Sequence, residues 1–347
     1  MRQLETRTPA LAAFDRLCPA GTGPVGVAVS GGSDSLALLH LSHDWAQAHG
    51  RNLIAFTFDH RLRDASAGEA ARVGEICRSL GICHETLQWD APISRQSAAR
   101  RARHAALACA LKAQGGTVLL TGHTADDQAE TFLMRARQGS TWYGLAGMQA
   151  VSPSPVWPEG AGVRIARPLL TARRSDLRHM LKARGAGWIE DPTNDNPVYE
   201  RVRMRHLLAA SPGLHARISR CLDDLGALRA IEDVRLGRWL RDHVHVSGPA
   251  HVTADLTVLG PESAARGMGL LIQAVTGRET PPRREKLQSL ADRVRASQAF
   301  AGATLGGAKV SRKGNIVHLV PETELDGLHP LLIPRLGDVR DLLLGQA

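Results

Sequence analysis

A glycine-rich turn between an apolar run and a helical pattern constrains this chain more than any other feature. The turn reads Ser30-Gly31-Gly32-Ser33-Asp34-Ser35; it follows the apolar run 25–29 and precedes the helical pattern 36–41. Two glycines let the backbone approach an anion closely, and a helix that begins here directs free N–H groups and its positive dipole end at that anion. The sequence therefore predicts that Ser30, Gly31, Gly32, Ser33 and Ser35 hold a phosphate group of a nucleotide triphosphate.

Asp34 adds a metal ion to this prediction. A carboxylate repels phosphate by itself, so we expect Asp34 to bind a bridging Mg²⁺. The chain has no G-x-x-x-x-G-K-[ST] motif, which excludes a Walker-type loop. Residues 21–26 do spell G-x-G-x-x-G, but they precede the strand and contain Pro24, whereas a dinucleotide site needs the glycines after the strand. We interpret them as a turn.

The first half of the chain alternates between strand-like and helical patterns. The repeat of about 30 residues predicts an α/β, Rossmann-like fold with a parallel twisted sheet and helices on both faces. Ligands bind beyond the carboxyl ends of such strands. Polar residues stand there: the glycine-rich turn, then Asp59 and His60, then Gly122 and His123. The predicted strands are 25–29, 53–58, 84–87 and 117–120, and the predicted helices are 36–49, 69–80, 94–114 and 125–137.

The second half differs in character. A Pro- and Gly-rich stretch, 148–162, is typical of an insertion or hinge rather than a hydrophobic element. A helix is predicted over 173–184. After Pro212 the pattern predicts a mainly helical region with a small β hairpin that turns at residues 313–315. We expect two domains, one over 1–212 and one over 213–347.

Composition limits the kinds of binding partner and the cellular compartment that we expect for this protein. The 347 residues include 43 Lys and Arg against 34 Asp and Glu, a net charge of +9, which favours a polyanionic partner, although coding bias can also enrich arginine. The five cysteines form no C-x-x-C pair, which argues against a disulfide framework and against a zinc or iron–sulfur site. No apolar run reaches about 18 residues, so we expect a cytoplasmic protein without a membrane span.

A second cluster is acidic. Asp126 and Glu130 are four residues apart on the helix predicted from residue 125, so they share a face, and Asp127 stands beside them. Like charges on one face are stable only beside a cation, for which a metal–phosphate complex or an ammonium group would serve. The alternative is an ordinary acidic first turn, which the helix dipole favours.

Arginines form two further patterns. Arg100 and Arg103 lie about one turn apart and could face a triphosphate or a tRNA backbone, or form a solvated basic face. Arg201, Arg203 and Arg205 alternate, as an extended strip that contacts phosphates would, although a solvated loop explains them nearly as well.

Taken in order, these pieces resemble a known family. The glycine-rich turn resembles the PP-loop of the N-type ATP pyrophosphatases, and within that superfamily the chain resembles the tRNA(Ile)-lysidine synthetases over roughly residues 22–210. The acidic block and the two segments at 167–170 and 188–194 are the most specific matches. The matching segments are 30–35, 58–63 with Ser66 and Glu69, Ala99-Arg100 with Arg103, 122–135, 144–148, Arg167-Pro168-Leu169-Leu170, and 188–194 with Arg201, Arg203 and Arg205.

The resemblance implies a two-step reaction. ATP adenylates the C2 oxygen of the wobble cytidine of a tRNA(Ile) with a CAU anticodon. The ε-amine of free L-lysine then attacks C2, and AMP leaves as lysidine forms. The resemblance also implies that the domain over 1–212 is catalytic, that the region over 213–347 binds tRNA, and that individual residues of this sequence have the following roles. Asp59, His60, Gly122 and His123 would bind the nucleotide; Asp34 would hold Mg²⁺; Asp126, Asp127, Glu130 and Arg100 would serve catalysis; and Arg103, Arg167, Arg173, Arg201, Arg203 and Arg205 would hold the tRNA.

Two residues depart from the family pattern. His104 stands where a tyrosine is expected, and Thr124 where many members have a second histidine.

Three other functions compete with the family function. A tRNA thiolase is disfavoured because C-x-x-C pairs are absent. A non-catalytic RNA-binding protein is disfavoured because Asp34 and the acids are intact. An amidotransferase-type synthetase is disfavoured because residue 2 is arginine rather than cysteine. A homodimer through the helical C-terminal part is conceivable.

Overall fold

The structure is a computed structural model that describes residues 11–19, 21, 23–61, 66–89, 96–190, 196–248, 250–296, 300–323, 339–341 and 343. It forms two compact units. Unit 1 comprises Met1–Ser154 and Gly162–Ala227, and unit 2 comprises Pro155–Ala161 and Leu228–Ala347. The change of unit after residue 227 falls inside the long helix α9 (Leu214–Asp242). The two-domain division at residue 212 stays a prediction.

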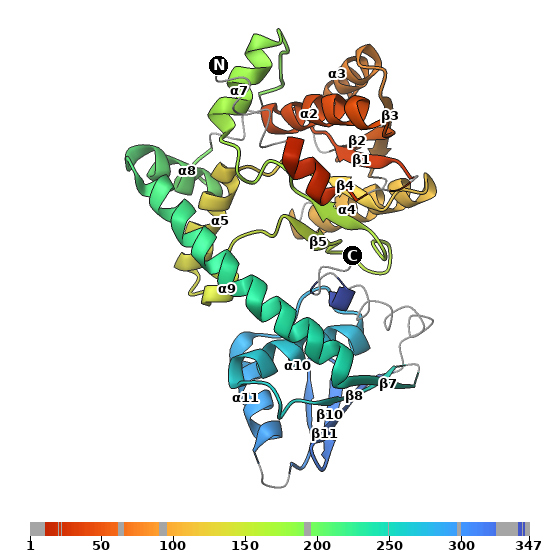
Figure 1. The fold of residues 1–347 in the computed structure, drawn as a ribbon, viewed down its shortest axis with the longest axis vertical. Helices are drawn as coiled ribbons and strands as arrows, with labels where there is room; N and C mark the ends of the chain where they lie inside the picture. Colours follow the sequence, from red (N-terminus) through yellow and green to blue (C-terminus); the bar gives the residue numbers. More distant parts are fainter. Residues whose placement is uncertain are drawn as a thin grey trace. The chain divides into compact units, whose positions relative to one another are not determined.

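Unit 1 is built on a six-stranded sheet in the order β3-β2-β1-β4-β6-β5 (Figure 1). All neighbouring pairs are parallel except the edge strand β5, which runs antiparallel to β6. The predicted parallel sheet is confirmed. Its strands are β1 (Val25–Ala28), β2 (Leu53–Asp59), β3 (Cys83–Gln88), β4 (Val118–Leu120), β5 (Val151–Pro153) and β6 (Arg164–Ala166).

Helices cover both faces of this sheet because the strand residues alternate between two cores. Val118 and Leu120 of β4 pack with α2, α3 and α7, whereas Leu119 packs on the other face with α4. The period of two is the one a pleated strand imposes. The helices of unit 1 before α9 are α2 (Ser33–His49), α3 (Ser66–Ser79), α4 (Gln96–Ala113), α5 (Ala125–Arg137), α6 (Trp142–Leu145), α7 (Arg174–Ala183) and α8 (Glu200–Ala210).

Two predictions about local structure were wrong. Arg201, Arg203 and Arg205 do not form an extended strip, because they lie in helix α8. The Pro-rich stretch is not simply a polar insertion: it contributes the edge strand β5, and Val156 and Trp157 within it are buried.

Unit 2 packs two helices and the C-terminal part of α9 against a five-stranded antiparallel sheet in the order β7-β8-β11-β10-β9. The predicted hairpin is confirmed as β10 and β11, within a larger sheet than expected. The described part of the chain has no helix long and apolar enough to span a membrane. The strands are β7 (Val244–Gly248), β8 (His251–Asp255), β9 (Ala303–Leu305), β10 (Ala308–Lys313) and β11 (Ile316–Pro321), and the helices are α10 (Pro261–Thr276) and α11 (Arg284–Arg295).

Candidate active site

The glycine-rich turn connects β1 to α2 as predicted, and hydrogen bonds fix its shape. The backbone N–H of Ser30 donates to Ser35 Oγ (3.1 Å), and Ser35 Oγ donates to the carbonyl of Gly32 (3.0 Å). Gly32 is the N-cap of α2 and makes no side-chain cap. The first N–H groups of α2 therefore have no capping side chain at this end, as an anion site at a helix N-terminus requires.

Two glycines are required by close approaches. Gly31 has φ +84°, and a Cβ there would lie 2.5 Å from Ile189 Cδ1. The Ile189 N–H also donates to the Gly31 carbonyl (2.9 Å). At Gly122, a Cβ would lie 3.0 Å from the carbonyl oxygen of Asp34. The loop that follows β4 thus passes directly against the turn that follows β1, and this brings the acidic block beside the phosphate loop.

The acidic block begins helix α5, and a capping box holds Asp127 in place. Thr124 Oγ1 accepts from the Asp127 N–H (3.3 Å), while Asp127 Oδ2 accepts from the Thr124 backbone N–H and hydroxyl (both 2.9 Å). Thr124 is fully buried. The residue that departs from the family pattern is therefore a structural cap that orients Asp127.

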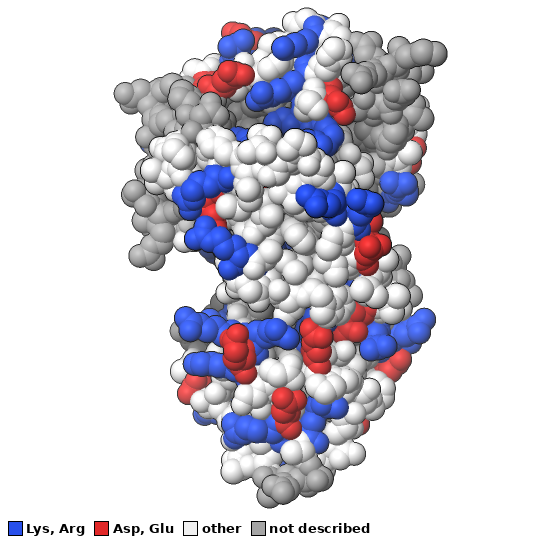
Figure 2. Space-filling view, turned by 90° about the vertical axis from the view of Figure 1, so that its left-hand side faces the viewer, with Lys and Arg blue, Asp and Glu red and all other residues white. Residues whose placement is uncertain are grey.

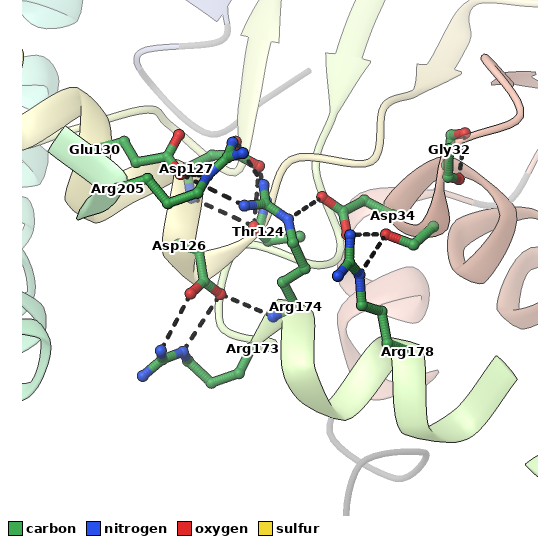
Figure 3. Close-up of polar contacts among 12 residues, drawn as sticks. Gly32, Asp34, Thr124, Asp126, Asp127, Glu130, Arg173, Arg174, Arg178 and Arg205 are labelled. Atoms are coloured by element: carbon green, nitrogen blue, oxygen red, sulfur yellow. Dashed lines mark hydrogen bonds and ion pairs between the residues drawn. The ribbon is translucent and has the colours of Figure 1, made fainter. Parts of the chain in front are cut away.

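Arg174, which sequence reasoning missed, joins the two halves of the site (Figure 3). Its Nε donates to Asp34 Oδ2 (2.7 Å), its Nη2 to Asp127 Oδ1 (3.1 Å) and its Nη1 to Glu130 Oε1 (3.4 Å). Three carboxylates from two helices thus converge on one guanidinium at the start of α7. The only signal in the sequence is the Arg173-Arg174 pair a few residues beyond Arg167-Pro168-Leu169-Leu170.

Arg173 and Arg178 complete the contribution of α7. Arg173 pairs with Asp126 through Nε (3.3 Å) and Nη2 (3.1 Å), and the Arg174 N–H donates to the same carboxylate (2.8 Å). Arg178 Nε donates to Ser33 Oγ in the phosphate loop (3.2 Å). One helix therefore presents arginines to both the loop and the acids.

Glu130 is fully buried and is held from the other side by α8. Arg205 Nε lies 3.0 Å from its Oε1, and Arg201 Nε lies 3.3 Å from its Oε2. Arg201 and Arg205 are four residues apart, so they share a helix face. Arg203 lies elsewhere and donates to the carbonyls of Pro197 and Val198 (both 2.8 Å).

Burial and pairing with arginine compete, and their balance shifts the pKa values of Asp34 and Asp126 in opposite directions. Burial raises the pKa of Asp34, and Arg174 offsets only part of that shift. Burial acts the same way on Asp126, but the Arg174 N–H and the Arg173 side chain outweigh it and lower its pKa. Although burial favours the neutral form of Arg174, its contacts with Asp34 and Asp127 raise the pKa of the guanidinium.

A second cluster brings together Arg100 and Arg103 of α4 with Arg167 and His123. Burial, followed by the charge of nearby Arg167, lowers the pKa of His123 to about 4. Burial also lowers the pKa of Arg167 to about 10, with Arg100 contributing, and that of Arg103. Arg167 Nη1 donates to Gln149 O (2.9 Å) and Ser152 Oγ (3.0 Å), so it anchors the loop before β5.

Asp59 and His60 stand at the end of β2, next to β1. Asp59 is buried and accepts from the Arg61 N–H (2.8 Å). The His60 ring lies edge-on to Phe58, with ring centres 4.8 Å apart. Residues 62–65 and 191–195, which carry parts of two predicted motifs, lie outside the described residues.

The donor set suits a hard divalent cation. Asp34 and Asp127 direct oxygens at one position, which the Arg174 guanidinium occupies in this structure. No group of three or more His, Cys, Asp or Glu side chains that could hold a metal occurs among the described residues. Mg²⁺ commonly takes one or two carboxylates and completes its shell with phosphate and water.

Comparisons with known proteins agree with this architecture. The family model described as PP-loop domain matches residues 7–211. In its fold, the chain is similar to the U34-tRNA thiolase NcsA from Methanococcus maripaludis, solved with its 4Fe-4S cluster. The TM-score is 0.53 at 17% identity, over 65% of this chain and 78% of that one. At that identity the likeness concerns the fold alone.

Two curated relatives are much closer in sequence. The tRNA(Ile)-lysidine synthase of Hyphomonas neptunium is 51% identical over 322 residues, which are 93% of this chain and 87% of the relative. That of Caulobacter vibrioides is 38% identical over 308 residues, which are 86% of this chain and 67% of the relative. The chain therefore belongs to the tRNA(Ile)-lysidine synthase family and carries a PP-loop domain at residues 7–211.

Proposed function

We propose that this protein ligates L-lysine to C2 of the wobble cytidine of a tRNA(Ile) with a CAU anticodon, through an adenylated cytidine. The observation that carries the proposal is the junction of phosphate loop and acidic block. Asp34 of the loop and Asp127 and Glu130 of the block meet at one cation, in a chain that belongs to this family. Such a junction puts a leaving pyrophosphate beside a site for a cationic nucleophile.

The geometry supports the following proposed roles. Ser30, Gly31, Gly32, Ser33 and Ser35 bind the phosphates of ATP through the turn and the start of α2. Asp34 and Asp127 hold Mg²⁺, which neutralises charge on the pyrophosphate when bound. Asp59, His60, Gly122 and His123 line the nucleotide site beside that turn.

The acids and arginines divide the remaining roles. Asp126, Asp127 and Glu130 bind the ammonium groups of lysine, and Arg100 stabilises charge at the adenylated centre. Arg103, Arg167, Arg173, Arg201, Arg203 and Arg205 hold the tRNA by phosphate contacts. A tRNA-modifying enzyme works where tRNA is used, so we place the protein in the cytoplasm. A homodimer stays a prediction.

The test is the transfer of radiolabelled L-lysine to an isoleucine CAU-tRNA transcript with ATP and Mg²⁺. Acid-stable label in that transcript, and none in the methionine tRNA with the same anticodon, is the expected result. ATP cleavage to AMP and pyrophosphate without label would instead point to another nucleophile, and sulfide would be tried first.

The Asp34→Ala variant tests the phosphate-site assignment. We expect this variant to lose ATP turnover and to keep nearly unchanged affinity for tRNA, because Asp34 binds the metal beside the pyrophosphate and does not contact the tRNA. Filter binding measures the affinity, and pyrophosphate release measures turnover. Asp44→Ala is the matched control, since Asp44 lies on the same helix and pairs with Arg184 (2.7 Å). Normal turnover in Asp34→Ala would refute the assignment.

A further inference from the structure

The acidic block is neutralised by the protein itself. Each of its carboxylates, and that of Asp34, contacts at least one arginine. Four carboxylates (Asp34, Asp126, Asp127, Glu130) face four guanidinium groups (Arg173, Arg174, Arg201, Arg205), so the formal charge of the network is −4 + 4 = 0. In this arrangement the block offers an incoming cation little net attraction.

Arg174 is the central member of the network. Its side chain and that of Asp34 are each 18% exposed, Asp127 is 11% exposed and Glu130 is fully buried. Ion pairs with so little exposure are only weakly screened by water or salt. A cation that seeks Asp127 or Glu130 must compete with a guanidinium that is already in contact with both.

An anion bound in the phosphate loop, Ser30–Ser35, would release Arg174 from the carboxylates. A guanidinium binds phosphate oxygens as readily as carboxylates, because its planar fork suits both. Arg174 already touches the loop through Asp34, and Arg178, one turn further along α7, touches it through Ser33. A polyphosphate bound at Ser30–Ser35 would therefore be close to the arginine side chains of α7.

We propose that Arg174 is a latch that makes cation binding at Asp127 and Glu130 depend on prior binding of a polyphosphate. With the loop empty, Arg174 occupies the carboxylates. With polyphosphate bound, Arg174 turns to the phosphate oxygens, and the carboxylates accept the ammonium groups of the amino-acid substrate. The latch rests on the proposed function for the identity of that substrate, and it predicts that the nucleotide binds before lysine.

The first arm of the test uses the unaltered protein. Isothermal titration with L-lysine is run with and without α,β-methylene-ATP and Mg²⁺, an analogue that cannot release pyrophosphate. We expect lysine to bind at least about tenfold more tightly with the analogue, since one contact between charges accounts for such a factor. Lysine binding that is measurable and equally tight in both conditions would overturn the latch, whether or not any variant folds.

The second arm uses Mn²⁺ alone as the cation, detected by electron paramagnetic resonance without nucleotide. Arg174→Met should bind Mn²⁺ at least about tenfold more tightly than the unaltered protein, whereas Arg174→Lys, which keeps the charge, should not. Arg184→Met is the matched control, because Arg184 is the C-cap of the same helix but pairs with Asp44, and it should behave as the unaltered protein does. No gain of Mn²⁺ affinity in a folded Arg174→Met would overturn the latch.

The two arms separate the latch from the proposed function. If Arg174→Met gains Mn²⁺ affinity but lysine binds in no condition, the latch stands and the amino-acid assignment fails. Arg174→Met leaves Asp34 and Asp127 without their arginine, while Glu130 keeps Arg201 and Arg205, so the variant is expected to be less stable. Mn²⁺ should then raise its melting temperature more than that of the unaltered protein, and the absence of such a rise would count against the latch.

Discussion

At the scale of single residues, His104 is the least compensated group in unit 1. It is 6% exposed, and neither ring nitrogen has a hydrogen-bond partner within the described part of the chain. Burial, followed by the charges of Arg103 and Arg100, lowers its pKa to about 3 from an ordinary 6.5. His104 is therefore neutral in the folded protein at neutral pH, and it stands where the family pattern has an aromatic residue.

This makes stability depend on pH in a predictable direction. Between about pH 3 and 6.5 the unfolded chain binds a proton at His104 and the folded protein does not, so acid favours unfolding. For such a shift, the linkage relation gives a loss of about 2 kcal/mol at pH 5 from His104 alone. His104→Phe should remove that share of the loss, as measured by urea unfolding at pH 7.5 and pH 5. Identical pH dependence in both proteins would contradict the assignment.

The residues whose role is chemical were easier to predict than those whose role is positional. The phosphate loop and the acids of α5 were found because their residue types carry the chemistry at a local spacing. Arg174 was missed because its three partners lie 44 to 140 residues away in sequence, and only the fold brings them together. Its neighbour Arg173, predicted to contact tRNA, pairs with Asp126 instead; its contact with tRNA stays a proposal.

At the scale of elements, the spacing of the arginines at 201, 203 and 205 fits both a strand and a helix, and the prediction of an extended strip was wrong. Arginines at i, i+2 and i+4 suit an extended strand, and the outer two also suit a helix face. Helix α8 resolves the ambiguity, because Arg201 and Arg205 both reach Glu130 while Arg203 does not. Strands β5 and β6 were not predicted because neither is a continuous run of apolar residues, whereas β4, which is equally short, is such a run and was predicted. Helix α10 was also not predicted.

The start of α5 offers a prediction at this scale. Thr124→Ala removes the hydroxyl of the capping box and should cost about 1 kcal/mol of unfolding free energy. Thr124→Ser keeps the hydroxyl and should retain most of that unfolding free energy. Because Thr124 also donates to Asp127 (2.9 Å), we expect the alanine variant to raise the KM for lysine as well. Chemical unfolding with steady-state kinetics measures both, and equal effects of the two substitutions would argue against a capping role.

At the scale of the whole molecule, net charge matters less than which charges are already paired. The formal charge is +9, yet four arginines of the candidate site are matched by its acids: Arg173, Arg174, Arg201 and Arg205. On the face drawn in Figure 2, basic side chains form several groups and acidic ones stand beside many of them. Attraction for a polyanion must therefore come mainly from arginines without a carboxylate partner. Arg203 is exposed, and its hydrogen bonds go to carbonyl oxygens.

Arg203 thus gives the sharpest prediction for tRNA binding. Arg203→Ala should weaken binding most at low salt and reduce the slope of log K against log salt by about 1, because one phosphate contact releases about one counterion. Arg241→Ala is the matched control: Arg241 is half exposed but pairs with its neighbour Asp242 (2.8 Å), so its removal should leave the slope unchanged. Filter binding over a salt series measures both slopes. A slope that is unchanged in Arg203→Ala, or that falls equally in both variants, would mean that unpaired charge on α8 does not select where the tRNA backbone lies.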